Sequence, residues 1–522
     1  MKQTGIRLKQ TAIRYLAILL ALWMLVVSFM ACSGKGSDQE TGTTGSTVES
    51  EDLPDNSGEE SVLLHPKKQD FGGYTYRMVF DGGLSTQWWG PLDDLTSDAL
   101  DLAFFRRNEF LKDYLNIEIM MVSLGASQYQ MADHLATMAS VGEDFADAMF
   151  AVAAHIMPSA VANGYALELS NMEGLNPEAS YWDQRIQQEY AVQGYLFALE
   201  GDFTIYDELR THVVLYNGKL YGDYGYTSDY GSPYTMVRDG KWTMDTMLEM
   251  IEGRSDLDNG PLTASSQWGM LSETPFPYIV FLGTGKKTIQ VQEDGSLSLL
   301  FADPTYYSTA YSMFENIMNK VGLNQEVLFA DASRGVLTGD IWVEVSNMFE
   351  SNQALFRTTT LSAATRLYNM QASFGILPIP KYEESQETYY SWCSADAHSP
   401  LMIPSTALSH CDTTAAITEA MCYFSKYMDS DEQTVLEAFY ENMAVAKLCR
   451  SEEDYAMLQL IFANKTYDID LALGITGIRH VLTGLIGKQD ITTLSSEFKS
   501  RQENSSKALS EFLSDMMKNM KN

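Results

Sequence analysis

Hydrophobic and polar positions recur with two periods along the chain, and these periods predict strands and helices in turn. Residues 74–80 are rich in aromatic and β-branched side chains and stop at the turn signal Asp81-Gly82-Gly83, so they predict a strand. Between Ser97 and Leu115 apolar residues share one helical face. The same patterns then predict a strand, a helix and a buried strand: residues 117–121, 128–140 and 147–152. This order predicts an α/β fold with a parallel sheet.

The pattern starts again in the second half of the chain. Residues 211–216 predict a strand, and Thr243 is placed to cap a helix whose first turn contains Asp245. Residues 374–380 predict a strand that prolines stop, and the chain from about Thr414 onward is mostly helical. Two sheet-forming regions predict two lobes.

The N-terminal segment has the pattern of an export signal. The first 14 residues contain four basic and no acidic side chains, and residues 15–31 are apolar apart from Ser28. An uncleaved membrane anchor is the alternative. Phe29-Met30-Ala31-Cys32 resembles a bacterial lipobox, which implies that residues 1–31 are removed and that Cys32 carries the lipid. We therefore expect residues 32–67, which are rich in Gly, Ser, Thr and acids, to be a flexible tether on the outer face of the cell membrane.

Composition and charge exclude several classes of protein. The 522 residues include 35 basic and 69 acidic ones, a formal charge of −34, which repels phosphate backbones and argues against nucleic-acid binding. Only one stretch is apolar enough to enter a bilayer, so a multi-pass membrane protein is excluded. The remaining cysteines fit no zinc spacing and are expected to be buried free thiols, although an exported protein can form disulfides: Cys393, Cys411, Cys422 and Cys449. No metal or other cofactor is expected.

Several segments resemble the extracellular solute-binding proteins of ABC importers, most closely the carbohydrate-type group. The resemblance runs from Asp70-Phe71-Gly72-Gly73-Tyr74 onward over most of residues 68–520. Its most specific stretches are Ser232 to Thr243 and Phe374 to Tyr382. Shorter motifs also carry the resemblance: Arg107-Asn108, residues 142–147 and residues 215–220.

The resemblance implies a type II periplasmic-binding-protein fold, with two lobes around a ligand cleft and a hinge of more than one strand. Lobe one would take residues 68–195 and 390–445, and lobe two residues 205–385 and 446–522. It implies a monomer that captures a carbohydrate, expected to be an oligosaccharide, and delivers it by hinge closure to the permease subunits of an ABC transporter. No chemical step is expected.

Aromatic and acidic residues near strand ends are the candidate ligand contacts, because rings cover sugar faces and carboxylates bind hydroxyls. Trp88 and Trp89 follow the first strand, and His155 follows the third, at the edge where ligands of α/β sheets bind. Glu200 and Asp202 lie near the first lobe crossing, which the resemblance places at the cleft floor. For His155 a surface or capping role is favoured over ligand contact.

Three further candidates are Trp268, Trp392 and Arg357. Trp392 precedes the expected second crossing, where it would meet ligand or pack the hinge. Arg357 follows a predicted strand at 354–356, and an ion-paired surface arginine is the favoured interpretation of it. Trp242 is predicted to be a core residue.

Motifs of catalysis are absent: the sequence has no H-E-x-x-H, G-x-S-x-G, P-loop or G-x-G-x-x-G pattern. A glycosidase needs only two carboxylates, however, and 69 acids always offer pairs. An exported glycoside hydrolase or lyase is therefore one alternative function. A sugar-sensing surface protein of the same fold is another.

Overall fold

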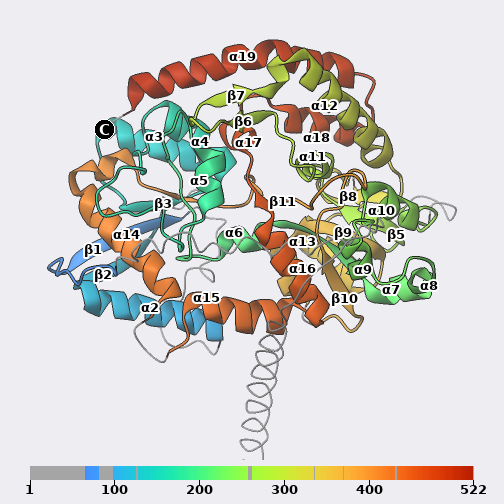
Figure 1. Ribbon diagram of the computed structural model, residues 1–522, viewed down its shortest axis with the longest axis horizontal. Coiled ribbons are helices and arrows are strands. Elements are labelled where there is room, and N and C mark those ends of the chain that lie inside the picture. Colours follow the sequence, from blue (N-terminus) through green and yellow to red (C-terminus); the bar gives the residue numbers. More distant parts are fainter. Residues whose placement is uncertain are drawn as a thin grey trace, which may run out of the picture. The chain divides into compact units, whose positions relative to one another are not determined.

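The computed structural model describes residues 65–80, 98–124, 127–256, 262–333, 335–367, 369–428 and 432–520. Within these residues the main strands form one four-stranded and one five-stranded sheet (Figure 1). The predicted signal peptide, the tether, Cys32, Trp88 and Trp89 lie outside the described residues.

The first sheet has the strand order β12-β3-β1-β2. Its strands are β1 (Tyr74–Phe80), β2 (Ile117–Ser123), β3 (Ala148–Phe150) and β12 (Leu401–Met402). β1 runs parallel to β2 and to β3, with Met78 opposite both Met121 and Ala148, and β12 joins antiparallel from far along the chain. The predicted strand, helix, strand, helix, strand order is confirmed. β3 is shorter than predicted, because the chain leaves the sheet after Phe150 and starts a helix at Ala153.

Helices pack around this sheet and define the first lobe. They are α2 (Ala99–Leu115), α3 (Met131–Val141), α4 (Ala153–Ala162), α5 (Gln184–Tyr190) and α14 (Cys411–Lys426). α2 begins where the Asp98 carboxylate accepts a hydrogen bond from the backbone N–H of Leu100 at 3.0 Å. α3 ends at Gly142, whose φ of +68° suits a residue without a Cβ.

The second sheet has the strand order β10-β4-β9-β5-β8 and defines the second lobe. Its strands are β4 (His212–Asn217), β5 (Trp268–Ser272), β8 (Val327–Phe329), β9 (Ala354–Thr360) and β10 (Phe374–Leu377). β5 is parallel to β8 and β9, whereas β4 is antiparallel to β9 and β10. Arg357 therefore lies inside a strand, and the prediction that it follows one is wrong. The strand is longer because Thr358 and Thr359 continue the pairing with β4.

Between Tyr206 and Leu367 the chain also forms helices and a β-hairpin. Thr243 caps α10 by accepting the N–H of Thr246 at 3.2 Å, as predicted. The helices are α6 (Tyr206–Leu209), α7 (Gly218–Asp223), α8 (Tyr226–Asp229), α9 (Pro233–Arg238), α10 (Met244–Ile251), α11 (Phe276–Leu282), α12 (Pro304–Ile317) and α13 (Ile341–Glu350). The hairpin is β6 (Ile289–Val291) and β7 (Leu297–Leu299). The 3-10 helices are η3 (Leu300–Ala302), η5 (Ala330–Ala332) and η6 (Leu361–Leu367), and η4 (Met318–Gly322) is a π-helix.

From about Thr414 onward the chain is mostly helical, as predicted. In this region and just before it lie η7 (Ser405–His410), α15 (Val435–Ala438), the π-helix η8 (Phe439–Leu448), α16 (Glu452–Ala463), α17 (Ile469–Leu473), α18 (Ile478–Lys488) and α19 (Leu494–Asn519). α16 packs on β10 of the second lobe, and α17 contacts α4 of the first. This part of the chain therefore contacts both lobes.

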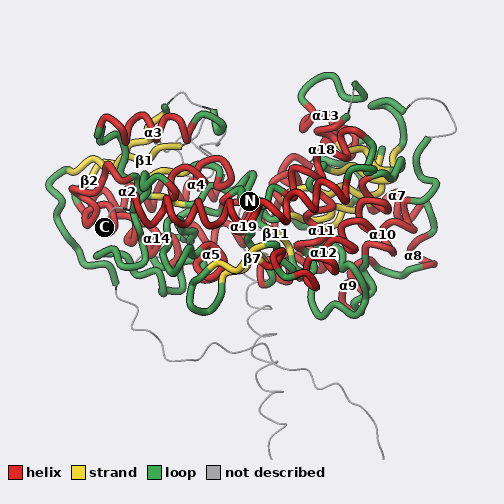
Figure 2. The backbone as a smooth tube through the Cα atoms, turned by 90° about the horizontal axis from the view of Figure 1, so that it is seen from above, coloured by secondary structure: helices red, strands yellow, loops and turns green. Residues whose placement is uncertain are grey.

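The chain crosses between the lobes more than once, and the crossing segments pair with one another. Leu199 donates its N–H to the Leu401 carbonyl at 3.0 Å, and Thr211 bridges to Cys393. β11 (Ser391–Trp392) runs parallel to β13 (Lys465–Thr466). Figure 2 shows β11 between the strands of the first lobe and the helices of the second. Because the crossing segments pair with one another, the two lobes can move relative to each other in only a few directions.

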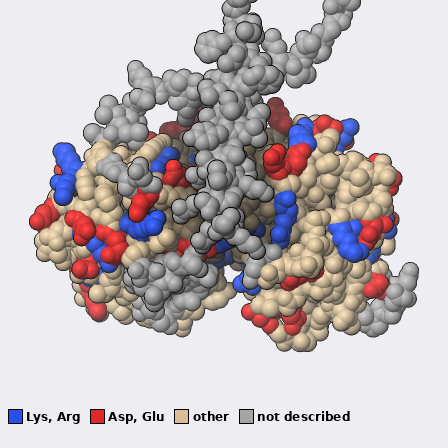
Figure 3. Space-filling model, turned by 90° about the horizontal axis from the view of Figure 1, so that it is seen from below, with Lys and Arg blue, Asp and Glu red and all other residues tan. Residues whose placement is uncertain are grey.

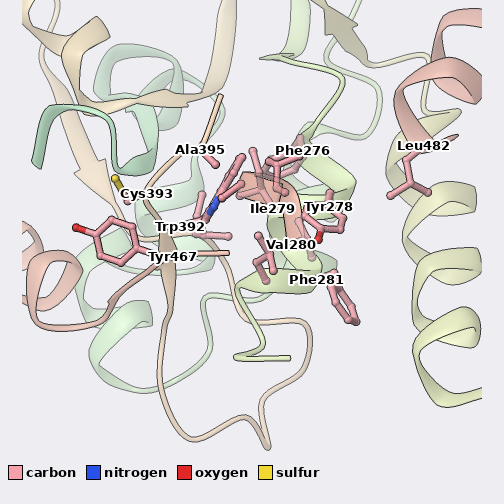
Figure 4. Packing of buried hydrophobic residues seen from close by; sticks show 14 of the residues in the cluster. Phe276, Tyr278, Ile279, Val280, Phe281, Trp392, Cys393, Ala395, Tyr467 and Leu482 are labelled. Carbon is pink, nitrogen blue, oxygen red and sulfur yellow. The ribbon is translucent and has the colours of Figure 1, made fainter. Parts of the chain in front are cut away.

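The core is continuous through the crossing region. Trp242 is completely buried, which confirms its predicted core role, and its indole N–H donates to the Pro378 carbonyl at 2.9 Å. Figure 4 shows Trp392 among labelled residues of the same buried cluster, with Cys393 on one side and Ile279 of α11 on the other. In the described part of the chain, Cys393 and Cys422 are buried free thiols, whereas the free Cys411 and Cys449 are only partly buried.

Candidate functional site

One loop lies close to the ends of the parallel strands in both lobes. In the first lobe α4 follows β3, and the N–H groups of Ala153 and Ala154 donate to the carbonyls of His398 and Ala395 at 3.1 and 2.9 Å. In the same loop, Asp396 forms an ion pair with Arg479 at the start of α18. Asp396 also acts electrostatically on Glu273, the residue that follows β5. The loop from Cys393 to Ser399 thus lies between the strand ends of the two lobes.

A carboxylate with an altered pKa lies at the strand ends of the second lobe. Burial, followed by the nearby Asp331, raises the pKa of Glu273 to about 7. The Thr359 hydroxyl donates to Glu273 at 3.4 Å, and Asp331 accepts from the N–H of Thr274 at 2.9 Å. A half-buried carboxyl group that titrates near neutrality is typical of functional sites. Glu273 was not among the sequence candidates, because one acid among 69 carries no distinguishing pattern.

A tryptophan lies beside Glu273 with its ring partly in solvent. Trp342 is 42% exposed and, like Glu273 and Arg357, lines a small depression at the ends of β5 and β8. Asp340 caps α13 by accepting the N–H of Trp342 at 3.0 Å. Trp342 precedes Val345 and Phe349 by three and seven residues, so it shares their face of the helix, and its partial exposure comes from its place in the first turn. No sequence signal marked it as exposed, because a tryptophan on the apolar stripe of a helix predicts a core residue.

Arg357 is a buried residue that contacts the helix carrying Trp342. It is 4% exposed, and its Nη1 donates to the Ser346 hydroxyl of α13 at 3.0 Å. Burial lowers the pKa of Arg357 to about 10, against the opposing effect of Glu273. The guanidinium remains charged at neutral pH and joins β9 to the helix that carries Trp342.

The first lobe presents an aromatic pair at its own strand ends. Tyr129 is 72% exposed, and its ring centroid lies 4.7 Å from that of His155 in the first turn of α4. His155 thus occupies the edge at which the sequence placed it. Tyr129 was not singled out from the sequence, because it lies in the connection before α3 rather than directly after a strand. Two exposed rings and a carboxyl group therefore lie on strand-end segments of the two lobes. We call these residues, Tyr129, His155, Glu273 and Trp342, the strand-end edge.

Buried polar groups fill the space where the chain crosses between lobes. Glu200 and His398 are both 0% exposed, with Glu200 Oε1 2.8 Å from His398 Nδ1. Burial, followed by Asp207, raises the pKa of Glu200 well above its usual value, and burial lowers the pKa of His398 to about 3. Both shifts favour a neutral pair in which the carboxylic acid donates to Nδ1. His398 Nε2 then meets the Tyr190 hydroxyl at 3.0 Å.

A buried lysine joins three crossing segments beside this pair. Lys465 of β13 forms ion pairs with Asp183 at 2.8 Å and with Asp207. Burial disfavours ionisation of Asp183, yet Lys465 and a hydrogen bond from Tyr467 lower its pKa to about 2. Burial also opposes the charge on Lys465, but the surrounding carboxylates raise its pKa well above its usual value. The crossing segments are therefore tied by charge as well as by backbone pairing.

The remaining candidates lie at separate places. Burial raises the pKa of Asp202 to about 7, and its carboxylate lies 3.6 Å from the Lys426 ammonium. The Trp392 ring stacks on His212 with centroids 5.2 Å apart. Trp268 is 5% exposed and lines a separate cavity of about 740 Å³ along β8 and α18. Ligand contact by Glu200, Asp202, Trp268 and Trp392 stays a prediction. We call the buried group Asp183, Glu200, Asp207, Trp392, His398, Lys465 and Asp468 the crossing layer.

Other features of the described residues bear on what the protein can hold. Among them, no cluster of His, Cys, Asp and Glu is arranged to bind a metal ion, and no helix has the length and apolar character to cross a membrane. Figure 3 shows acidic and basic side chains next to one another in small groups on the face it presents. Exposed ion pairs of this kind, such as Arg238 with Glu453, contribute little stability.

Comparisons with known proteins identify the fold. No family model matches the sequence, and no curated protein matches it. A cyclo/maltodextrin-binding protein complexed with maltotetraose is 13% identical, with a TM-score of 0.51 over 84% of this chain and 96% of that one. An ABC substrate-binding protein from Listeria monocytogenes in complex with cycloalternan is 10% identical, with a TM-score of 0.51 over 84% and 99%.

A sugar transporter protein from Rhizobium etli, in an open conformation, is 12% identical with a TM-score of 0.51 over 85% of this chain and 99% of that one. The chain therefore has the two-lobed α/β fold of periplasmic binding proteins. The order β2-β1-β3 with an antiparallel strand added from later in the chain is that of the type II arrangement predicted from the sequence.

Proposed function

We propose that this protein is the extracytoplasmic binding subunit of an ABC importer and that its ligand is a carbohydrate, most simply an oligosaccharide. The observation that carries the proposal is the strand-end edge, where exposed rings and a carboxyl group lie on two lobes and the same loop, Cys393 to Ser399, lies between the strand ends. Rings stack on the apolar faces of sugars, and carboxylates accept hydrogen bonds from hydroxyls. The fold supports the proposal, since proteins that share it hold maltotetraose and cycloalternan.

Binding would work by population shift. A sugar that contacts Tyr129 in one lobe and Trp342 in the other gains both contacts only when the lobes approach, so ligand favours the closed form. Permease subunits would then recognise that form. The ligand leaves unchanged, so no residue is assigned a chemical step.

The test is a titration of the purified protein with maltotetraose, cycloalternan and a wider glycan panel, followed by tryptophan fluorescence and calorimetry. Saturable binding with full recovery of intact sugar supports the proposal. Release of shorter sugars would instead favour a glycoside hydrolase or lyase. Binding to no glycan, combined with binding to peptides, would overturn the carbohydrate assignment.

We further propose that Cys32 anchors the protein to the outer face of the cell membrane and that residues 33–67 form the tether. The lipobox-like sequence supports this. Cys32→Ser should move the protein from the membrane fraction to the soluble extracytoplasmic fraction. Retention in the membrane would favour the uncleaved anchor. A sensor role without an importer predicts that no genes for permease subunits lie beside the gene for this protein.

A further inference from the structure

The C-terminal helix α19 contacts both lobes along a single rigid element. Its 26 residues give a length of about 39 Å. Figure 1 shows it running from the region of α12 and β7 to the region of α3 and α4. It lies next to β7, η3 and α12 near one end and next to α4 near the other.

The N-terminal half of α19 is fixed to the second lobe. Phe498 packs edge-on against Phe314 of α12 with ring centroids 5.2 Å apart, and Gln502 Nε2 donates to the Phe301 carbonyl at 3.1 Å. α12 is itself held to that lobe, because Asn316 donates to the Tyr382 hydroxyl, just after β10, at 2.8 Å. This end of α19 therefore moves with the second lobe.

The C-terminal half is fixed to the first lobe. Met516 is 0% exposed, and Asn519 Nδ2 donates to the Ala162 carbonyl at the end of α4 at 3.0 Å. A Cβ on Gly164 would collide with the carbonyl oxygen of Asn519, so the helix end and the turn after α4 are in close contact. That turn is tied to the first sheet, since Leu167 donates to the Ile403 carbonyl at 2.8 Å.

We infer that α19 is a brace that restrains the relative rotation of the lobes and thereby regulates ligand capture. A straight helix docked at both ends permits rotation only about an axis close to itself, or after one end detaches. The first-lobe contact includes Met516 and Asn519 and is made with α4 and the turn that follows it, so a change in that turn can release this end of the helix. The effect on capture rests on the proposed function, whereas the effect on lobe movement does not.

A matched pair of glycine substitutions tests the brace. Gly164 and Gly142 have nearly equal positive φ angles, +65° and +68°, so alanine introduces the same backbone strain at both. Only at Gly164 does the added Cβ meet α19, because at Gly142 no heavy atom lies within 4 Å of it. G164A should loosen the helix end, and G142A should not.

The readout is the distribution of distances between spin labels at exposed Glu118 of β2 and Thr235 of α9, measured in the full chain without ligand. We expect a broader distribution in G164A than in G142A, which should match the parent. Equal widths in G164A and G142A would overturn the brace. If G164A fails to fold, N519A replaces it, with N504A as control, because Asn504 bonds only to Ser500 within the same helix.

Adding maltotetraose separates this inference from the proposed function. We expect the sugar to narrow the distribution in both glycine variants, with an apparent affinity that differs between them by about fivefold. A broadened distribution in G164A with no response of any variant to any glycan would uphold the brace and overturn the carbohydrate function. A glycan response with equal distance distributions and equal affinities in G164A and G142A would overturn the brace and uphold the carbohydrate function.

Discussion

In the crossing layer Glu200, His398 and Trp392 are 0% exposed, whereas at the strand-end edge Trp342 is 42% and Tyr129 72% exposed. Both regions contain at least one acid, a histidine and a tryptophan. In the crossing layer each charge or ring has a protein partner, as with Lys465 and its carboxylates. At the edge, large parts of the rings face solvent. Residue type alone therefore does not distinguish a ligand contact from a structural contact. The degree to which the surrounding chain encloses each side chain does.

The largest expected effect is on the buried lysine. Lys465→Met leaves Asp183 and Asp207 buried without their cation, which should lower the free energy of unfolding by about 3–5 kcal/mol. Urea denaturation measures the change. Lys499→Met removes an exposed pair with Glu503 and should cost no more than about 0.5 kcal/mol. Equal losses in the two variants would mean that the crossing layer is not a structural unit.

Exchanging the two tryptophans for alanine should separate stability from binding. Trp392→Ala leaves a cavity next to His212 and should cost about 3–5 kcal/mol of unfolding free energy. Trp342→Ala should change the unfolding free energy by about 0.5 kcal/mol or less. It should, however, weaken oligosaccharide binding about tenfold through loss of stacking. Denaturation and calorimetry on both variants check this. Unchanged sugar affinity in Trp342→Ala would remove it from the site.

Asp468 in the crossing layer should make stability depend on pH. Burial, followed by Asp470, raises its pKa to about 7, and its carboxyl group accepts from the Tyr278 hydroxyl at 2.7 Å. Since the unfolded chain loses this proton near pH 4, stability falls as pH rises from about 4 to 7. Asp468→Asn should therefore stabilise the protein by about 2 kcal/mol at pH 8 and not at pH 4. Denaturant titrations across pH measure this. The exposed Asp133→Asn should show no such pH-dependent gain.

The smallest expected effect concerns Glu273. As pH rises through about 7 its carboxyl group ionises and becomes the stronger hydrogen-bond acceptor. Sugar affinity of the parent protein should therefore rise about threefold between about pH 6 and pH 8. Glu273→Gln, which cannot ionise, should show a flat profile, and Asp133→Asn should keep the parent slope. A parent profile that is already flat would mean that Glu273 does not touch the ligand. Calorimetry at each pH provides the measurement.

Local sequence patterns predicted several elements of the fold correctly. Residues 74–80 form the predicted strand, and Thr243 caps the predicted helix. Trp242 was correctly placed in the core. These features depend on neighbours a few residues apart, namely side-chain alternation, turn residues and capping hydroxyls. The position of Arg357 inside β9 was missed, because strand length is set by pairing with β4 rather than by the strand's own residues.

The alternation of strands and helices, the two sheet-forming regions and the acidic charge of the chain follow from local sequence patterns and composition. Which acids and rings are enclosed and which face solvent depends on the tertiary structure. Glu200 and Glu273 are chemically identical, and each lies close to a chain segment that the patterns could place. Glu200 is enclosed by His398 and the crossing strands, whereas Glu273 lies beside an exposed tryptophan. Burial depends on contacts between residues far apart in the chain, and a periodic pattern carries no information about them.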